Sequence, residues 1–152
     1  MPLLLIAGSP LDDSILPEIE ARTAKNDCGD AVRIIGRRYD IENWMQAADV
    51  IALPSHEGTE GLPRVLFEGM ACGAVALGTD VSGVREAIPP GTGLLVPEHS
   101  PEAIAEVLKK LMNEPNYTEQ LRKAGIESAR LRFDSRASAS AVEKVYESLL
   151  EK

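Results

Sequence analysis

The chain has 152 residues, a mass of 16.4 kDa, a formal net charge of −8 and an isoelectric point near 4.8. These values are typical of one soluble domain, and the acidic balance disfavours nucleic acid and anionic lipid as partners. Cys28 and Cys72 are too few for a disulfide framework or a cysteine zinc site. The apolar start lacks the basic region of a signal peptide, and no apolar run approaches the roughly 20 residues of a membrane span. We therefore expect a cytoplasmic chain with no transmembrane segment.

Five short apolar segments, each followed by Gly or Pro, are predicted to be buried parallel strands, and segments with helical apolar spacing separate them. In chain order we expect strand 3–7, helix 14–26, strand 31–35, helix 41–48, strand 49–53, a polar loop 56–62, helix 63–72 with Pro63 as its first residue, strand 74–77, helix 84–88, strand 94–96, and helices 101–113, 117–133 and 135–152. The alternation predicts an α/β fold: a three-layer, Rossmann-like domain with a mainly parallel sheet of about five strands and C-terminal helices. We expect residues 1–152 to form this single domain.

Two carboxylates, Glu60 and Glu68, flank the start of the helix predicted over 63–72. Helical side chains lean toward the N-terminus, so Glu68 is expected to point toward the loop that carries Glu60. The first N–H groups of the helix have no helical carbonyl as partner and attract anions. The pattern predicts a phosphate site between two carboxylates that can accept hydrogen bonds from hydroxyl groups. A nucleotide-diphosphate sugar has the matching order of parts, with a diphosphate between a ribose and a sugar. A plainer alternative is that Glu60 caps the helix and Glu68 is a surface residue.

The stretch from Pro54 to Gly73 resembles the donor-binding motif of the retaining GT-B glycosyltransferases of family four, also called group 1. Glu60, seven residues and Glu68 match the two glutamates of that motif. Gly69-Met70-Ala71-Cys72-Gly73 departs from the family's Ala-Met-Ala-x-Gly only in its first residue, which lowers helix propensity by about 0.5–1 kcal/mol. The resemblance covers nearly the whole chain: further matches, in the order in which the family has them, are residues 5–8, 32–36, 47–50, 82–86, 93–96 and 133–146.

The resemblance implies that Glu60 is the catalytic residue, in contact with the donor sugar near the transferred carbon, and that Glu68 holds the ribose hydroxyls. The donor-binding residues that it implies are Glu60, Gly61, Leu62, Arg64, Val65 and Glu68 at the sugar, diphosphate and ribose, and Gly36 and Arg37 beside the base. It further implies transfer of a sugar from a nucleotide-diphosphate donor with retention, without a metal or other cofactor. The chain has no Asp-x-Asp metal motif, which agrees.

The family's donor-binding half begins with an earlier strand-loop-helix unit, whose Arg and Lys grip the diphosphate, and an N-terminal acceptor domain precedes it. We expect both to be missing from this chain, so that the isolated chain binds a nucleotide-sugar donor but is inactive. An alternative is a stand-alone nucleotide-sugar-binding subunit that pairs with an acceptor domain on another chain. Any contact with a membrane surface is expected from the missing half.

Other features of the sequence leave alternatives open. A receiver-like domain is suggested by Asp12-Asp13, but the third predicted strand ends without an acceptor Asp. The run from His56 to Glu60 lacks the final histidine of the His-Glu-x-x-His zinc motif, so no metal site is expected there. His56 is expected to line the loop and His99 to be solvated. Cys72 is expected to be a small core residue, and Arg37-Arg38 is either a nucleotide contact or a solvated pair.

Overall fold

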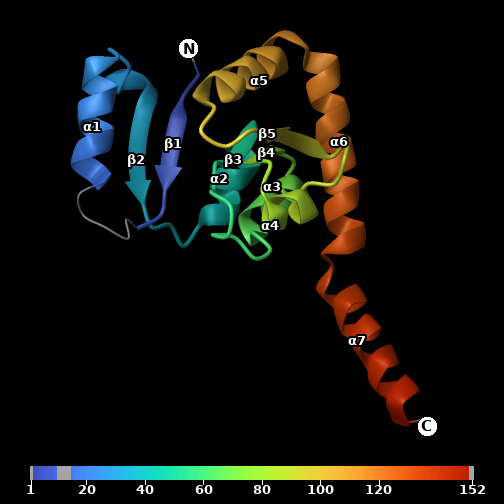
Figure 1. Cartoon of the computed structure of the whole chain (residues 1–152). Helices are drawn as coiled ribbons and strands as arrows, with labels where there is room; N and C mark the ends of the chain where they lie inside the picture. Colours follow the sequence, from blue (N-terminus) through green and yellow to red (C-terminus); the bar gives the residue numbers. More distant parts are fainter. Residues whose placement is uncertain (1, 10–14, 151–152) are drawn as a thin grey trace. The chain divides into compact units, whose positions relative to one another are not determined.

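A computed structural model describes residues 2–9 and 15–150 of the chain (Figure 1). Contacts divide the chain into two compact units, residues 1–41 and 42–152, which we call the N-terminal unit and the C-terminal unit. Each is described by itself. The prediction of a single domain over 1–152 stays a prediction.

The N-terminal unit is a two-stranded parallel sheet with one helix. Its elements are β1 (Leu4–Ala7), α1 (Ile15–Lys25), a 3-10 turn (Gly29–Ala31) and β2 (Val32–Gly36). Leu4 lies opposite Val32, and the register shifts between Ile6 and Ala7. None of the described side chains in this unit is buried. The segment with Asp12 and Asp13, and the predicted helix start at Ser14, lie outside the described residues.

The C-terminal unit contains the other three strands and most of α2 (Ile41–Ala47). The strands are β3 (Val50–Leu53), β4 (Val75–Thr79) and β5 (Gly93–Val96), which form one parallel sheet with β4 in the centre. Because β4 has a partner on both edges and helices over both faces, all five of its residues are buried. The carboxyl ends of the three strands therefore meet at one edge of this sheet, where parallel α/β folds bind ligands.

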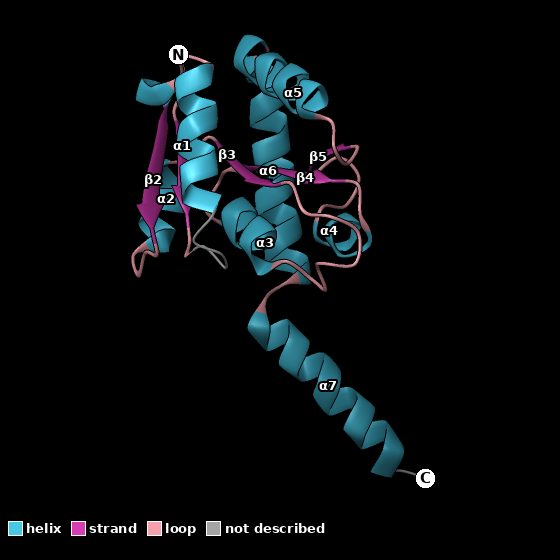
Figure 2. Cartoon of the chain, turned by 60° about the vertical axis from the view of Figure 1, so that its left-hand side comes forward, coloured by secondary structure: helices cyan, strands magenta, loops and turns pink. Residues whose placement is uncertain are grey.

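Helices on both faces of the sheet build two core clusters. The helices are α3 (Arg64–Ala71), α4 (Ser82–Ala87), α5 (Pro101–Asn113), α6 (Pro115–Arg132) and α7 (Ser135–Leu150). Successive residues of a strand point to opposite faces: Ala76 joins a cluster with side chains from α3 and α4, whereas Val75 joins one with Leu111 of α5 and Leu121 of α6. The end of α6 also lies beside α3 (Figure 2), and the rings of Phe67 and Phe133 stack there at 4.2 Å.

At Gly69, α3 packs closely against the sheet. A Cβ atom at this position would lie 2.6 Å from Cγ1 of Ile51 in β3, which is closer than real Cβ atoms come. Where the family motif typically has alanine, glycine lets α3 pack directly on the β-branched side chain of β3. The departure from the family pattern is therefore a packing requirement as well as a loss of helix propensity.

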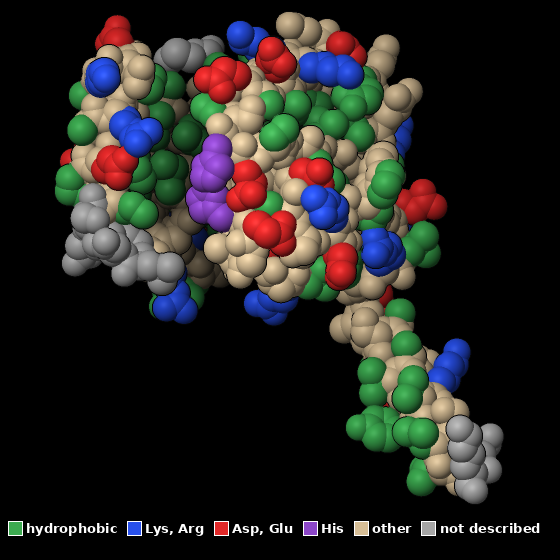
Figure 3. Space-filling model, in the orientation of Figure 1, with side chains coloured by type: hydrophobic (Ala, Val, Ile, Leu, Met, Phe, Trp, Pro, Cys, Tyr) green, Lys and Arg blue, Asp and Glu red, His purple; other side chains and the backbone are tan. Residues whose placement is uncertain are grey.

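The final helix, α7, buries none of its described residues. Val142, Val145, Tyr146 and Leu149 repeat at helical spacing along it and are between 55% and 65% exposed. Hydrophobic groups are visible along this helix in Figure 3. Among the described residues, no helix combines the length and the apolar character needed to cross a membrane.

The predicted order and type of the helices and strands are confirmed, with differences in strand pairing, burial and element bounds. The five strands form two sheets instead of one, since strand patterns do not specify which strands pair. Only β4 is buried along its whole length, because each of the other four strands carries at least one exposed position. Pro63 precedes α3 as its N-cap residue, with ψ of 105°, and is not its first helical residue. Finally, α4 begins at Ser82 and not at Val84, because Val81 supplies the extended N-cap position.

Candidate functional site

The loop between β3 and α3 carries Glu60, and two hydrogen bonds through Ser55 fix its position. The Ser55 hydroxyl donates a hydrogen bond to Oε1 of Glu60 at 2.7 Å. The hydroxyl of Thr79, the last residue of β4, in turn donates to the Ser55 carbonyl oxygen. Glu60 is half-buried. These bonds hold its carboxylate near the carboxyl edge of the sheet.

Gly83 fixes the same loop from the other side. A Cβ atom on Gly83 would lie 1.9 Å from the carbonyl oxygen of Gly61 and 2.7 Å from that of Glu60. The N–H of the neighbouring Ser82 donates to Oε2 of Glu57 at 3.2 Å. The start of α4 is therefore in contact with the backbone of Glu60 and Gly61, and only glycine leaves room for this approach.

The N-terminus of α3 follows directly after this loop. Pro63 is buried, and no side chain caps the helix. The first N–H groups of the helix, those of Arg64 and Val65, have no helical carbonyl to which they can donate. Leu62, just before them, is 45% exposed. This end of α3 thus has the polarity and the free donors that favour an anion.

Glu68 is the fifth residue of α3. Its side chain is 45% exposed and pairs with Arg64, with 3.8 Å between Nε and Oε1. Because the Arg64 side chain is 81% exposed, solvent screens this pair and it contributes little to stability. The carboxylate of Glu68 can therefore exchange the arginine for another donor, such as a hydroxyl.

Cys72 ends α3 and is half-buried. Desolvation raises the pKa of its thiol, and the carboxylates of Glu42 and Glu68 raise it further. A thiol held in the protonated state is a poor nucleophile. Cys72 is consequently a packing residue that is less buried than expected.

Gly36 and Arg37, the residues predicted beside the base, lie in the N-terminal unit. Gly36 has φ of 64°, a left-handed conformation at the end of β2 that favours glycine. The Arg37 guanidinium lies 5.4 Å from the centre of the Tyr39 ring. Arg38 donates two hydrogen bonds to the carboxylate of Asp40, at 2.9 and 3.0 Å, and this bonding raises the pKa of Arg38. The structure brings Glu60, Gly61 and the start of α3 together in the C-terminal unit, whereas the base contacts stay a prediction.

His56 and His99 lie together, which the sequence analysis missed. Their rings stack with centroids 4.8 Å apart, and the side chains form the purple patch in Figure 3. Nδ1 of His56 is 3.3 Å from Oε1 of Glu98, and the same oxygen accepts a hydrogen bond from the Glu57 N–H at 2.9 Å. His99 is exposed, as expected, and it also stacks on His56. The signal that could have found the pair is topological, because His56 follows β3 and His99 follows β5 at the same edge of a parallel sheet.

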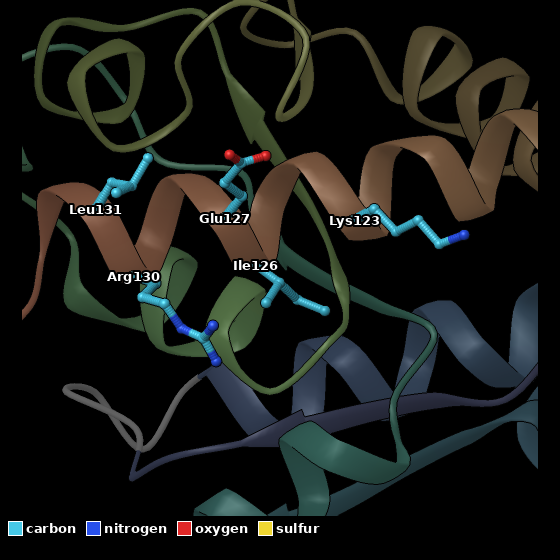
Figure 4. Close-up of a pocket in the computed structure, with 5 residues that line it drawn as sticks. All are labelled: Lys123, Ile126, Glu127, Arg130 and Leu131. Atoms are coloured by element: carbon cyan, nitrogen blue, oxygen red, sulfur yellow. The ribbon is translucent and has the colours of Figure 1, made fainter.

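Two hollows in the described surface lie along α6, away from these residues. One, of about 430 Å³, is lined by Lys123, Ile126, Glu127, Arg130 and Leu131. Figure 4 shows that Ile126 and Arg130 leave the helix on one side and Glu127 and Leu131 on the other. The second hollow shares Ile126 and Arg130 and continues to Phe133. Neither includes a predicted site residue.

Comparison with known proteins establishes the family. The family described as "Glycosyl transferases group 1" matches residues 2–128. The chain belongs to the group 1 glycosyltransferases. It is 34% identical, over 97% of its length and 35% of the relative, to a D-inositol 3-phosphate glycosyltransferase of Jonesia denitrificans. This membership leaves no basis for a receiver-like domain.

Two further comparisons agree with the family. The chain is 31% identical, over 74% of its length and 30% of the relative, to a GDP-mannose-dependent monoacylated alpha-(1-6)-phosphatidylinositol monomannoside mannosyltransferase of Corynebacterium glutamicum. Its structure superposes with a TM-score of 0.91 on Anabaena Alr3699/HepE in complex with UDP, at 21% identity, over 97% of this chain and 41% of the other. The GT-B fold of such structural neighbours confirms the predicted α/β class. The chain spans about a third of the length of the curated relatives that it matches.

Proposed function

We propose that this chain is part of the donor-binding half of a retaining glycosyltransferase and that it binds a nucleotide-diphosphate sugar at the carboxyl edge of the β3–β4–β5 sheet. The observation that carries the proposal is the fixed position of Glu60. Ser55 holds its carboxylate at 2.7 Å, and Gly83 lets α4 close on its backbone. A preorganised carboxylate beside a helix N-terminus is the arrangement that glycosyl transfer from a diphosphate needs.

In this proposal, different residues bind the sugar, the ribose and the diphosphate of the donor. Glu60 contacts the sugar near the transferred carbon, and Glu68 accepts hydrogen bonds from the ribose hydroxyls. The backbone of Gly61, Leu62, Arg64 and Val65 binds the diphosphate. The partial positive charge at the start of α3 stabilises the leaving diphosphate, so that transfer needs no metal.

Gly36 and Arg37 border the base in this proposal. The left-handed turn at Gly36 lets the chain approach a ring closely, and the Arg37 guanidinium is already placed over one aromatic ring. A planar guanidinium can stack on a purine or a pyrimidine in the same way.

The names of similar proteins support the donor class. One relative is named for its dependence on GDP-mannose, and one structural neighbour was solved in complex with UDP. Both indicate nucleoside diphosphates, with different bases. We also place the chain in the cytoplasm, in keeping with two free cysteines.

The chain spans about a third of the length of the curated relatives that it matches. We propose that an acceptor domain outside this sequence, on the same or another chain, completes the transferase.

Calorimetric titration with UDP-glucose, GDP-mannose and ADP-glucose tests the donor site. We expect saturable binding of one donor class, and at least tenfold weaker binding in Glu68→Ala, since a hydrogen bond to a charged group contributes about 1.5–3 kcal/mol. Glu106→Ala, which removes an exposed carboxylate from α5, is the matched control and should bind like the parent chain. Failure of all three donors to bind, or equal binding by the Glu68 variant, contradicts the proposal.

The isolated chain should not turn the donor over. Transfer needs an acceptor held against the sugar and protection from water, which a second domain must supply. We expect no release of nucleoside diphosphate in a coupled assay at donor concentrations that saturate binding. Sustained release that Glu60→Gln abolishes would show that the chain is a complete enzyme and would overturn this part of the proposal.

A further inference from the structure

The group formed by His56, Glu98 and His99 has the composition of a metal site. Each of the three residues places a ligand atom within 4.8 Å of the other two, and among the described residues no other group of histidines, cysteines and acids does so. Two imidazoles and one carboxylate are a common ligand set for zinc and related divalent ions.

The distance between His56 and Glu98 fits two ligands of one bound ion. Nδ1 of His56 and Oε1 of Glu98 are 3.3 Å apart, which is long for an N–H···O hydrogen bond, commonly about 2.7–3.2 Å. Two ligand atoms bound tetrahedrally at about 2.0–2.1 Å from zinc lie about 3.3–3.4 Å from each other. One edge of a tetrahedral site therefore has the required length, and the ligand atom of His99, within 4.8 Å of the other two, must move closer to bind the same ion.

The surroundings support a ligand role for Glu98. The backbone N–H of Glu57 donates to its Oε1 at 2.9 Å and so orients the carboxylate. Such second hydrogen bonds are usual for metal-binding carboxylates. His99 has φ of 54°, a left-handed conformation that few residues other than glycine adopt. The net charge of −8 also favours the approach of a cation.

We propose that His56, Glu98 and His99 bind one divalent transition-metal ion such as Zn²⁺, with the fourth position left to water. The ion joins the loop after β3 to the loop after β5. It lies outside the proposed transfer chemistry and holds the loop that carries Glu60. This inference does not depend on which donor binds.

Metal titration of the tag-free, metal-free chain tests the site. We expect one Zn²⁺ per chain by competition with a chromophoric chelator, and a Co²⁺ complex whose visible bands indicate nitrogen and oxygen ligands without a thiolate charge-transfer band. A hundredfold excess of Zn²⁺ over its Kd should raise the ratio of folded to unfolded chain about a hundredfold. The chain has only these two histidines, so no other imidazole competes.

Single substitutions assign the ligands. His56→Ala, His99→Ala and Glu98→Gln should each weaken Zn²⁺ binding at least tenfold, because even second-layer partners of metal ligands typically change affinity 10–100-fold. Glu102→Gln, an exposed carboxylate in the first turn of α5, is the matched control and should change nothing. The Cys28→Ser/Cys72→Ser double variant should bind as before. Stoichiometric binding that survives both histidine substitutions, loss of binding on removal of the cysteines, or no stoichiometric binding at all overturns the proposal.

Discussion

The two units use the same kinds of element but differ in burial. Both pair parallel strands that follow or precede a helix, yet the C-terminal unit holds all the described residues that are buried, from Met45 to Ala129. In the N-terminal unit, Leu4 is 54% exposed and Ile34 is 39% exposed. Parallel strands are stable when both of their faces are covered, and β4 is the strand here that meets this condition along its length. The comparison shows that β1 and β2 have the apolar sequence of buried strands, although their apolar side chains are only partly covered.

The largest difference between the units is expected for side-chain truncation. Leu66 is 0% exposed, so Leu66→Ala should lower the free energy of unfolding by about 2–5 kcal/mol. The same truncation at the half-exposed Leu4 should change it by about 0.5 kcal/mol or less. Urea denaturation followed by circular dichroism measures both. If Leu4→Ala costs as much as Leu66→Ala, the contrast in burial between the units is wrong.

Substitutions of glycine by alanine compare the space around the backbone in the two units. The added methyl group of Gly83→Ala meets carbonyl oxygens, so the variant should lose about 1–3 kcal/mol and shift the amide resonances of Glu60 and Gly61. Gly29 of the N-terminal unit has open space around it, and Gly29→Ala is the control. It should be neutral or slightly stabilising. An unchanged spectrum for Gly83→Ala would mean that α4 does not lie against the loop.

The smallest difference concerns ion pairs. Arg122 and Asp49 of the C-terminal unit are 2.6 Å apart, and the arginine side chain is only 31% exposed, while Asp49 is 90% exposed. We expect a coupling energy of at most about 1 kcal/mol from a double-mutant cycle. For Arg22 and Glu18 of α1, 76% and 58% exposed, the value should be about 0.3–0.5 kcal/mol and should vanish in 1 M salt. Stronger coupling in α1 than between Arg122 and Asp49 would reverse the expected order.

Local features of the fold could be predicted from the sequence. Apolar runs that end at glycine or proline located all five strands, because burial and turn chemistry act over a few neighbouring residues. Glu60 and Glu68 could be selected for a similar reason, since their spacing around a helix start is also local. The boundary at Pro63 was missed by one position, as proline suits both the end of a loop and a first helical turn.

Features that depend on distant residues could not be predicted. The split into two sheets depends on which strands pair. The stacking of His56 on His99 joins residues 43 positions apart on two loops. The reason for glycine at position 83 is the carbonyl of Gly61, a contact that appears only when α4 is placed against the loop.

Because Gly69 packs against Ile51, the side-chain volume allowed at one of these positions depends on the residue at the other. The alanine that is usual in this family at position 69 has no room beside isoleucine at position 51. A redesign of this chain toward the family consensus must therefore replace both residues together. A larger side chain at position 69 of the helix requires a smaller one at position 51 of the strand. Chimeras with other members of the family face the same demand if their junction falls between β3 and α3.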